Sequence, residues 1–387
     1  MRIGLDARTI FRAQRRGTGK NLIDLYRQVI ALRPDWEVVA YHRDCASNDA
    51  LPGVQNRRIE MPGDRWHAWE RYRLPLAAWR DGVDLLHCPA NGCPDWMPTP
   101  TLVTIHDLIP LDAPASRGKG LATPRVGTSA HFARGIARAC AAAAGIICPS
   151  RYTRDRLVSQ CGADPGRIHV IPWAPDSAMQ VVEEYTCQAV LQRYGVRDRF
   201  VLHLGANDPR KNTRRVINAW AAIKPAQRRG WQLLIIGLEG QVVADLRQQA
   251  VQLNLGDSVI LHGFADEADM PALFSSADVL AFPSLSEGFG LPILDAWVDG
   301  TAVLTSSTTS LPEVAGDAAI LVDPSDTIAI TRGLSWLLRD SSLRRQLVDL
   351  GRQRVAQYTW QRTVSLFVEA AEAAAQRQRA RIQSRAA

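Results

Sequence analysis

The sequence has few of the features that mark disulfide-bonded or membrane-spanning proteins. Its seven cysteines are scattered, their number is odd, and no pair has the C-x-x-C spacing. We therefore expect reduced thiols and a cytoplasmic protein. No apolar run reaches the length of about 18 residues that a membrane-spanning helix needs. No apolar leader precedes the strand-like start MRIGLDARTI, so any membrane contact is expected to be peripheral.

Patterns typical of nucleic-acid and zinc-binding proteins are also missing. There is no helix-turn-helix, zinc-finger or RNP pattern, and we expect no nucleic-acid partner. His87 with Cys88 and Cys93 fits no standard zinc site, and we expect neither a metal nor another cofactor. The formal net charge of +7 still favours an anionic partner, such as a nucleotide, a phosphate or an acidic membrane surface.

Apolar runs and helical patterns alternate along the 387 residues, which are too many for one ordinary core. Strands are expected at 3–5, 38–41, 85–86, 102–105, 145–148 and 169–171, and again at 200–204, 233–236, 259–261, 279–281, 302–305 and 319–322. Helices are expected at 21–32, 131–144, 212–223 and 242–253. This order predicts an α/β protein with two doubly wound sheets.

The change of pattern places the domain boundary in the proline-containing stretch 172–184. We expect an N-terminal domain at 1–173 and a C-terminal domain at 174–358. A helix at 359–387 is expected to pack back on the first domain and to end in a basic tail.

Two cations and two carboxylates follow strands of the second half. Arg210 and Lys211 stand in GANDPRKN, between a strand and a helix, where a strand end and a helix N-terminus suit a diphosphate. A solvated turn with two surface cations is the alternative. Glu287 follows another strand in SLSEGFGLPILD, beside glycines that permit close backbone approach. Asp295 is expected in the first helical turn, where it could equally be a partner of the helix dipole.

The first half offers weaker candidates. Gly17 and Gly19 follow a basic loop with Arg8, Arg12, Arg15 and Arg16 and precede the expected helix, but a lone G-x-G is weak evidence for phosphate binding. His106 ends an expected strand, as an active-site or a core histidine would. The segment 65–79 mixes arginines with aromatic residues and could lie on an anionic bilayer or form a core helix.

Five segments in the same order resemble the retaining GT-B glycosyltransferases of family 4, especially mannosyltransferase-like members. These are 104–110 (THDLIP-like), PSRYTRDRL, GANDPRKNTRRVINAW, SLSEGFGLPILDAW and LPEVAGDAAILVDP. The fourth resembles the E-x7-E motif of the family. The resemblance spans nearly the whole chain, and it implies two Rossmann-like domains facing each other across a cleft.

The resemblance also implies site residues. Arg210 and Lys211 match the basic pair on the donor diphosphate, the loop of Gly17 and Gly19 closes over it, and 307–311 flanks it. Glu287 lies near the transferred sugar, and Asp295 stands where the family usually has a ribose-binding Glu. The residues that touch the donor sugar or phosphate are His106, close to the anomeric carbon, and Gly288, Phe289, Gly290 and Leu291.

The implied reaction is hexose transfer with retention of configuration from a nucleotide-sugar to a glycan or polyprenyl-linked acceptor. GDP-mannose is the preferred donor, with a UDP-sugar as alternative. Many metal-dependent sugar transferases use a D-x-D motif, and none stands at a convincing strand end here, so Arg210 and Lys211 are expected to replace the metal. A nucleotide-sugar epimerase, a phosphorylase and a non-catalytic binding protein are the remaining alternatives.

Overall fold

The computed structural model describes residues 1–11, 17–43, 51–59, 68–112, 126–179, 183–197 and 199–386, with backbone only at 17–18, 126–130 and 378–386. These residues form two compact units. Unit 1 comprises Met1–Asp112, Pro124–Ala174 and Thr359–Ala387, and unit 2 is built on Pro175–Tyr358. The chain therefore passes from one unit to the other between Ala174 and Pro175.

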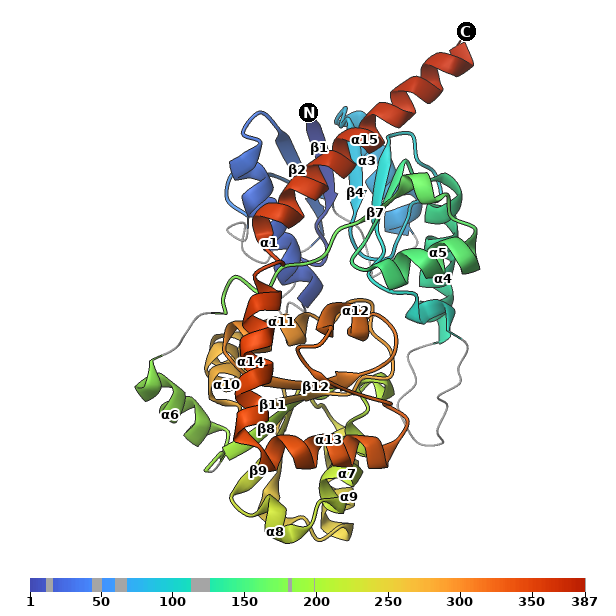
Figure 1. Cartoon of the computed structure of the whole chain (residues 1–387). Helices are drawn as coiled ribbons and strands as arrows, with labels where there is room; N and C mark the ends of the chain where they lie inside the picture. The colour runs from blue at the N-terminus through green and yellow to red at the C-terminus, as the bar shows by residue number, and fades with distance from the viewer. Residues whose placement is uncertain are drawn as a thin grey trace. The chain divides into compact units, whose positions relative to one another are not determined.

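Unit 1 is a parallel sheet with helices on both faces (Figure 1). Its strands are β1 (Arg2–Asp6), β2 (Glu37–His42), β3 (Gln55–Arg58), β4 (Leu85–Cys88), β5 (Thr101–Thr104), β6 (Gly145–Cys148) and β7 (Ile168–Val170). They lie in the order β3-β2-β1-β4-β5-β6-β7. Its helices are α1 (Gly17–Leu32), η2 (Trp69–Arg73), α3 (Leu74–Arg80), α4 (Val126–Ala142), α5 (Arg151–Cys161) and α15 (Trp360–Ala386). Helix α15 packs against α1 and against β4, β5 and β6.

Unit 2 repeats this architecture. Its strands are β8 (Arg199–Leu204), β9 (Trp231–Ile236), β10 (Val259–Leu261), β11 (Val279–Phe282), β12 (Ala302–Ser306) and β13 (Ile320–Val322), in the parallel order β10-β9-β8-β11-β12-β13. Its helices are α6 (Glu184–Arg193), α7 (Thr213–Ala222), α8 (Pro225–Arg228), α9 (Gln241–Gln252), α10 (Met270–Ser276), α11 (Leu291–Val298), α12 (Leu311–Ala315), α13 (Thr327–Arg339) and α14 (Ser341–Val355).

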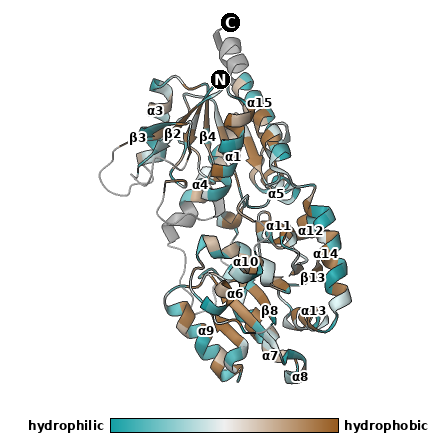
Figure 2. Ribbon diagram, turned by 90° about the vertical axis from the view of Figure 1, so that its left-hand side faces the viewer, coloured by the Kyte–Doolittle hydropathy of each residue, from teal (hydrophilic) through white to brown (hydrophobic). Residues whose placement is uncertain are grey.

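Both sheets are sandwiched by helices because their strands are apolar on both faces. The strands are mostly brown in Figure 2, whereas the helices carry teal on their outer sides. In unit 2, side chains from α7, α9 and α13 form one continuous core with the sheet. The predicted α/β class with two doubly wound sheets is thus confirmed.

Several predicted boundaries differ from those of the structure, and one strand was not predicted. Helix α1 begins at Gly17 rather than at residue 21, α4 begins at Val126 rather than at 131, and β5 ends at Thr104. The missed strand β3 has the sequence QNRR and a largely exposed edge position. It carries no apolar pattern because polar side chains protect a sheet edge from pairing with another chain.

Within the described residues, no helix combines the length and the apolar character needed to cross a bilayer. The six cysteines in this part of the chain are free, and four of them are buried: Cys88, Cys93, Cys140 and Cys148. Cys45 lies outside the described residues.

A pH-dependent stability is expected from Asp299, at the C-terminal end of α11. Burial raises the pKa of this carboxyl to about 6, and the nearby Ser275 side chain offsets the rise only in part. The folded state therefore favours the protonated form, and the ionised form destabilises it above pH 6. Asp299→Asn should raise the stability at pH 7.5 by about 1 kcal/mol, after allowing for solvent screening.

The gain should shrink as the pH falls below 6 and be small at pH 4, and it should disappear only below the ordinary pKa of 3.8, where the side chain is protonated in both folded and unfolded chains. Urea unfolding at pH 4, 5.5 and 7.5 measures this dependence. Asp349→Asn, at an exposed position of α14, is the matched control. An equal gain at all three pH values would contradict the assignment to Asp299 ionisation.

Candidate active site

The loop after β8 presents two cations at the carboxyl end of the unit 2 sheet. A short 3-10 helix, Pro209–Lys211, follows Asp208, whose carboxylate accepts a hydrogen bond from the Arg210 backbone N–H at 2.9 Å. Proline suits the first helical position because it lacks an N–H. Lys211 Nζ lies 4.6 Å from the centre of the Phe282 ring, which packs against its charged end. The sequence thus fixes both cations just beyond the strand.

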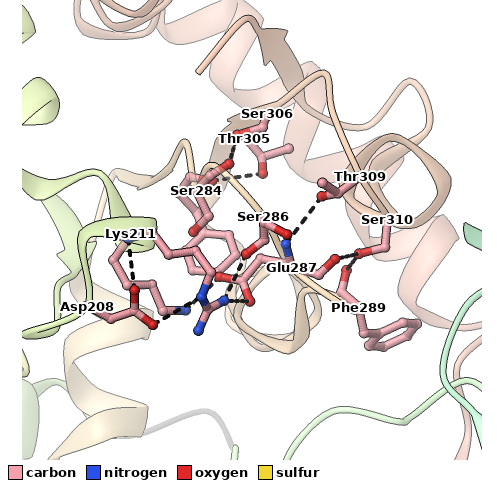
Figure 3. A network of polar contacts seen from close by, with 12 residues as sticks. Asp208, Lys211, Ser284, Ser286, Glu287, Phe289, Thr305, Ser306, Thr309 and Ser310 are labelled. Atoms are coloured by element: carbon pink, nitrogen blue, oxygen red, sulfur yellow. Dashed lines mark hydrogen bonds and ion pairs between the residues drawn. The ribbon is translucent and has the colours of Figure 1, made fainter. Parts of the chain in front are cut away.

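The loop after β11 presents Glu287 to these cations. Lys211, whose Nζ lies 2.7 Å from Glu287 Oε1, is drawn beside Glu287 in Figure 3. Arg210 Nη1 lies 2.9 Å from Glu287 Oε2. Arg210 Nε also pairs with Asp208 at 3.1 Å. Burial raises the pKa of Glu287, but the charges of Lys211 and Arg210 outweigh this and leave the pKa below its ordinary value. Glu287 is therefore ionised, and the four charged side chains together are neutral.

The position of this cluster follows from the strand order. Strands β8 and β11 are neighbours in the sheet although β9 and β10 separate them in sequence. The order reverses at this point, and the loops after the two strands diverge, which is where open α/β sheets bind ligands. Buried His203, in β8, links this strand to β11 and α7, because its ring lies 2.8 Å from Ala281 O and 3.0 Å from Thr213 Oγ1. Burial lowers the pKa of His203 to about 4, and its ring is neutral.

The segment 307–311 holds the Glu287 turn from the other side. Ser310 Oγ lies 2.9 Å and 3.0 Å from the carbonyl oxygens of Glu287 and Phe289, and Thr309 Oγ1 accepts a hydrogen bond from Glu287 N at 3.3 Å (Figure 3). Thr309 has a φ of +60°, which is rare for a β-branched residue. The segment that resembled a phosphate-flanking one is therefore in contact with the acidic turn.

Gly290 has to be glycine for two reasons. Its φ of +120° is one that L side chains rarely adopt, and an added Cβ would lie 2.7 Å from Leu311 Cδ2. Leu291 then begins α11, with Pro292 in the first turn. The predicted Gly288–Leu291 stretch thus lies directly beside Glu287, as the end of one strand-to-helix loop.

Asp295 lies in the second turn of α11, and the prediction of a first-turn position is wrong. The helix begins at Leu291, which makes Asp295 its fifth residue, so a role as partner of the helix dipole loses its basis. The side chain is buried, and Oδ1 accepts a hydrogen bond from Asp176 N at 3.0 Å. It therefore holds the first residues of unit 2.

His106 belongs to unit 1. It follows β5, and its backbone N–H donates to Asn91 Oδ1 at 2.6 Å. Its Nε2 lies 2.7 Å from Pro89 O, and its ring stacks on Trp173 at 5.9 Å. A carbonyl only accepts, so Nε2 carries the proton. Burial lowers the pKa of His106. The neutral ring therefore has an accepting Nδ1.

The glycines and arginines proposed from the sequence as phosphate-binding residues of unit 1 lie in different surroundings. Gly17 and Gly19 lie in the first turn of α1 and not in a loop before it, because the helix starts four residues early. Arg12, Arg15 and Arg16 lie outside the described residues. Arg8 is buried, and its Nη2 lies 2.6 Å from Asp6 Oδ2 and 3.0 Å from Glu70 Oε1; it is a core ion pair.

The structure also shows the surroundings of His87 and of part of the aromatic segment 65–79. Both ring nitrogens of His87 are engaged, with Tyr26 OH and Thr104 Oγ1 at 2.8 Å each, which leaves none for a metal. In the segment 65–79, residues 65–67 are not described, and Trp69 is buried beneath Arg8. Tyr72 and Trp79 are each 57% exposed, so the segment is part core and part surface.

Comparison with known proteins identifies the family. A model described as Glycosyltransferase Family 4 matches residues 16–178, and one described as Glycosyl transferases group 1 matches residues 193–354. The chain is a family 4 glycosyltransferase. The first matched region covers most of unit 1 and runs to residue 178, just past the passage between the units, and the second lies within unit 2, so both parts of this hexosyltransferase belong to the family.

Individual relatives of the glycosyltransferase are mannosyltransferases. The O-antigen chain mannosyltransferase B of Escherichia coli is 26% identical over 371 residues, which cover 92% of this chain and 95% of that protein. The serotype-specific mannosyltransferase WbdA of E. coli is 30% identical over 286 residues, or 71% of this chain. The match spans only 34% of WbdA.

The fold of the glycosyltransferase is similar to that of sucrose-phosphate synthase from Thermosynechococcus elongatus. The TM-score is 0.75 at 20% identity, and the match covers 95% of this chain and 97% of that one. This likeness confirms the GT-B class of two Rossmann-like domains.

Proposed function

We propose that this glycosyltransferase transfers mannose from GDP-mannose, with retention of configuration, to a glycan or polyprenyl-linked glycan. The observation that carries the proposal is the Arg210–Lys211–Glu287 cluster at the switch point of the unit 2 sheet. The similarity to O-antigen mannosyltransferase B along 95% of that protein supports mannose and a glycan acceptor.

In this proposal the two cations bind the donor diphosphate and stabilise the negative charge that it gains on leaving. The cluster is preassembled, because Asp208 and Glu287 hold both cations before the donor arrives. Preorganised charges lower the barrier because they need no rearrangement during the reaction. The diphosphate competes with Glu287 for the cations, which frees the carboxylate for the hydroxyl groups of the transferred sugar.

His106 fits a positioning role toward the sugar. Its neutral ring donates from Nε2 to Pro89 O, so Nδ1 can accept a hydrogen bond from a hydroxyl group. For Asp295 we propose contact with the ribose, in addition to its hydrogen bond with Asp176. A front-face route then needs no enzyme nucleophile, because the leaving phosphate oxygen accepts the proton of the acceptor hydroxyl.

We further propose that Arg210 and Lys211 make a divalent metal unnecessary. Peripheral contact with an anionic membrane would bring the enzyme to a lipid-linked acceptor. The surface near η2 and α3 supports this contact, because Tyr72 and Trp79 are exposed beside the exposed cations Arg71, Arg73 and Arg80. Aromatic and basic side chains together suit the interface of an acidic bilayer.

A nucleotide screen with a transfer assay tests the function. GDP and GDP-mannose at about 100 times Kd should stabilise the folded chain by about 2.7 kcal/mol, which raises its melting temperature by a few degrees. Mannose transfer to a polyprenyl-linked saccharide should continue in EDTA. Selective stabilisation by UDP would show that the donor is a UDP-sugar instead of GDP-mannose. Isomerisation of the donor without an acceptor would indicate an epimerase, and binding without turnover would contradict an enzymatic role.

A further inference from the structure

Asn212 occupies an unusual position between the two cations and helix α7. Its φ is +64°, in the left-handed region that asparagine tolerates better than most residues. Only 5% of the residue is exposed. Its backbone carbonyl accepts hydrogen bonds from Arg215 N and Val216 N, and it thereby starts α7.

The side chain of Asn212 ties three loops together at the carboxyl edge of the sheet. Its Nδ2 donates to Pro283 O at 2.9 Å, in the loop after β11, and to Pro324 O at 2.7 Å, in the loop after β13. Its Oδ1 accepts from Arg215 Nη1 at 2.5 Å. Both amide hydrogens and the amide oxygen are therefore engaged.

The first of these contacts bears directly on the charged cluster. Asn212 directly follows Lys211, and Pro283 lies four residues before Glu287. A backbone hydrogen bond from Leu285 N to Arg210 O, at 2.8 Å, joins the same two loops. The separation of Lys211 and Glu287 therefore depends on how firmly these loops are joined.

We propose that Asn212 is a positioning residue for glycosyl transfer, which rests on the function proposed above. Its carboxamide fixes the loop that carries Arg210 and Lys211 against the loop that carries Glu287. An aspartate has nearly the same size and also tolerates a left-handed backbone. It cannot donate, and its carboxylate would face two carbonyl oxygens and leave both unsatisfied.

Hydrogen exchange of the ligand-free protein tests whether the Asn212 side chain holds these loops together. In Asn212→Asp, exchange in the peptides that cover 283–290 and 323–327 should rise about tenfold. Asn254→Asp is the matched control, because Asn254 also has a positive φ, of +52°, but lies on the surface at the end of α9. Asn212→Gly suits the same backbone and should loosen the same peptides. Unchanged exchange in both Asn212 variants would overturn the proposal.

Kinetics then separate positioning from stability. With GDP-mannose, kcat of Asn212→Asp should fall about 10- to 100-fold, since misalignment of the charges weakens stabilisation of the transition state. The donor KM should change by less than about threefold, because the cations remain. Wild-type kcat in a folded variant with loosened loops would also overturn the proposal. If the wild-type protein itself ignores GDP-mannose, the proposed donor is wrong, and the exchange data alone decide whether the tie exists.

Discussion

Lys211→Ala should lower the turnover of glycosyl transfer by more than tenfold, and by about 10²- to 10³-fold where charge stabilisation dominates. The lysine is a partly buried cation whose Nζ touches Glu287 at 2.7 Å and lies over the Phe282 ring. Its loss leaves one cation, Arg210, to stabilise the leaving diphosphate. The fold should persist, because Glu287 retains its pair with Arg210 at 2.9 Å. Measurement of kcat at saturating GDP-mannose, with circular dichroism, gives the result.

Lys224→Ala provides the control for this change. Lys224 is exposed in the same unit, ahead of α8, so the variant loses one positive charge without disturbing the cluster. Its turnover should equal that of the wild type. Wild-type turnover in Lys211→Ala would remove Lys211 from the mechanism, and an equal fall in both variants would point to net charge rather than position.

The fold could be predicted because buried parallel strands appear in the sequence as short apolar runs. The runs at 200–204 and 279–281 became β8 and β11, and the alternation with helices gave two doubly wound sheets. Strand β3 escaped prediction because an exposed edge strand needs no apolar face. The start of α1 was misplaced because glycines suggested a loop, whereas Gly17 and Gly19 are in the first helical turn.

The charged centre of the site was predictable for a similar reason. Strand-end loops that carry Arg210, Lys211 and Glu287 meet wherever their strands are neighbours, and the structure brings the three together. The contacts that support this charged cluster could not be predicted from the sequence. The hydrogen-bond partners of Asn212 lie 71 and 112 residues away in sequence. Its left-handed backbone conformation cannot be recognised in the sequence, which shows only an asparagine after two cations. Asn91, whose Oδ1 accepts a hydrogen bond from His106 N, likewise has a positive φ that no sequence pattern indicates.

Glu287→Gln should abolish most glycosyl transfer, by about 10²- to 10³-fold, yet bind GDP at least as tightly as the wild type. The carboxylate is 13% exposed and satisfies both cations before the donor binds. A glutamine keeps the shape but not the charge, so it no longer competes with the diphosphate. Removing a like charge at this distance should tighten GDP binding up to about tenfold at low salt. Titration calorimetry with GDP, alongside kcat, measures the two effects.

Opposite changes in binding and turnover distinguish a residue that acts on the sugar from one that only holds the cations. If Glu287 merely oriented Arg210 and Lys211, its loss would weaken GDP binding and transfer together. If it contacts the sugar as the charge on the ring develops, transfer alone falls, because only stabilisation specific to the transition state affects kcat. Glu184→Gln, exposed at the start of α6, is the matched control and should leave both quantities unchanged. Weaker GDP binding in Glu287→Gln would therefore assign the carboxylate to cation positioning and leave the sugar contact to other groups.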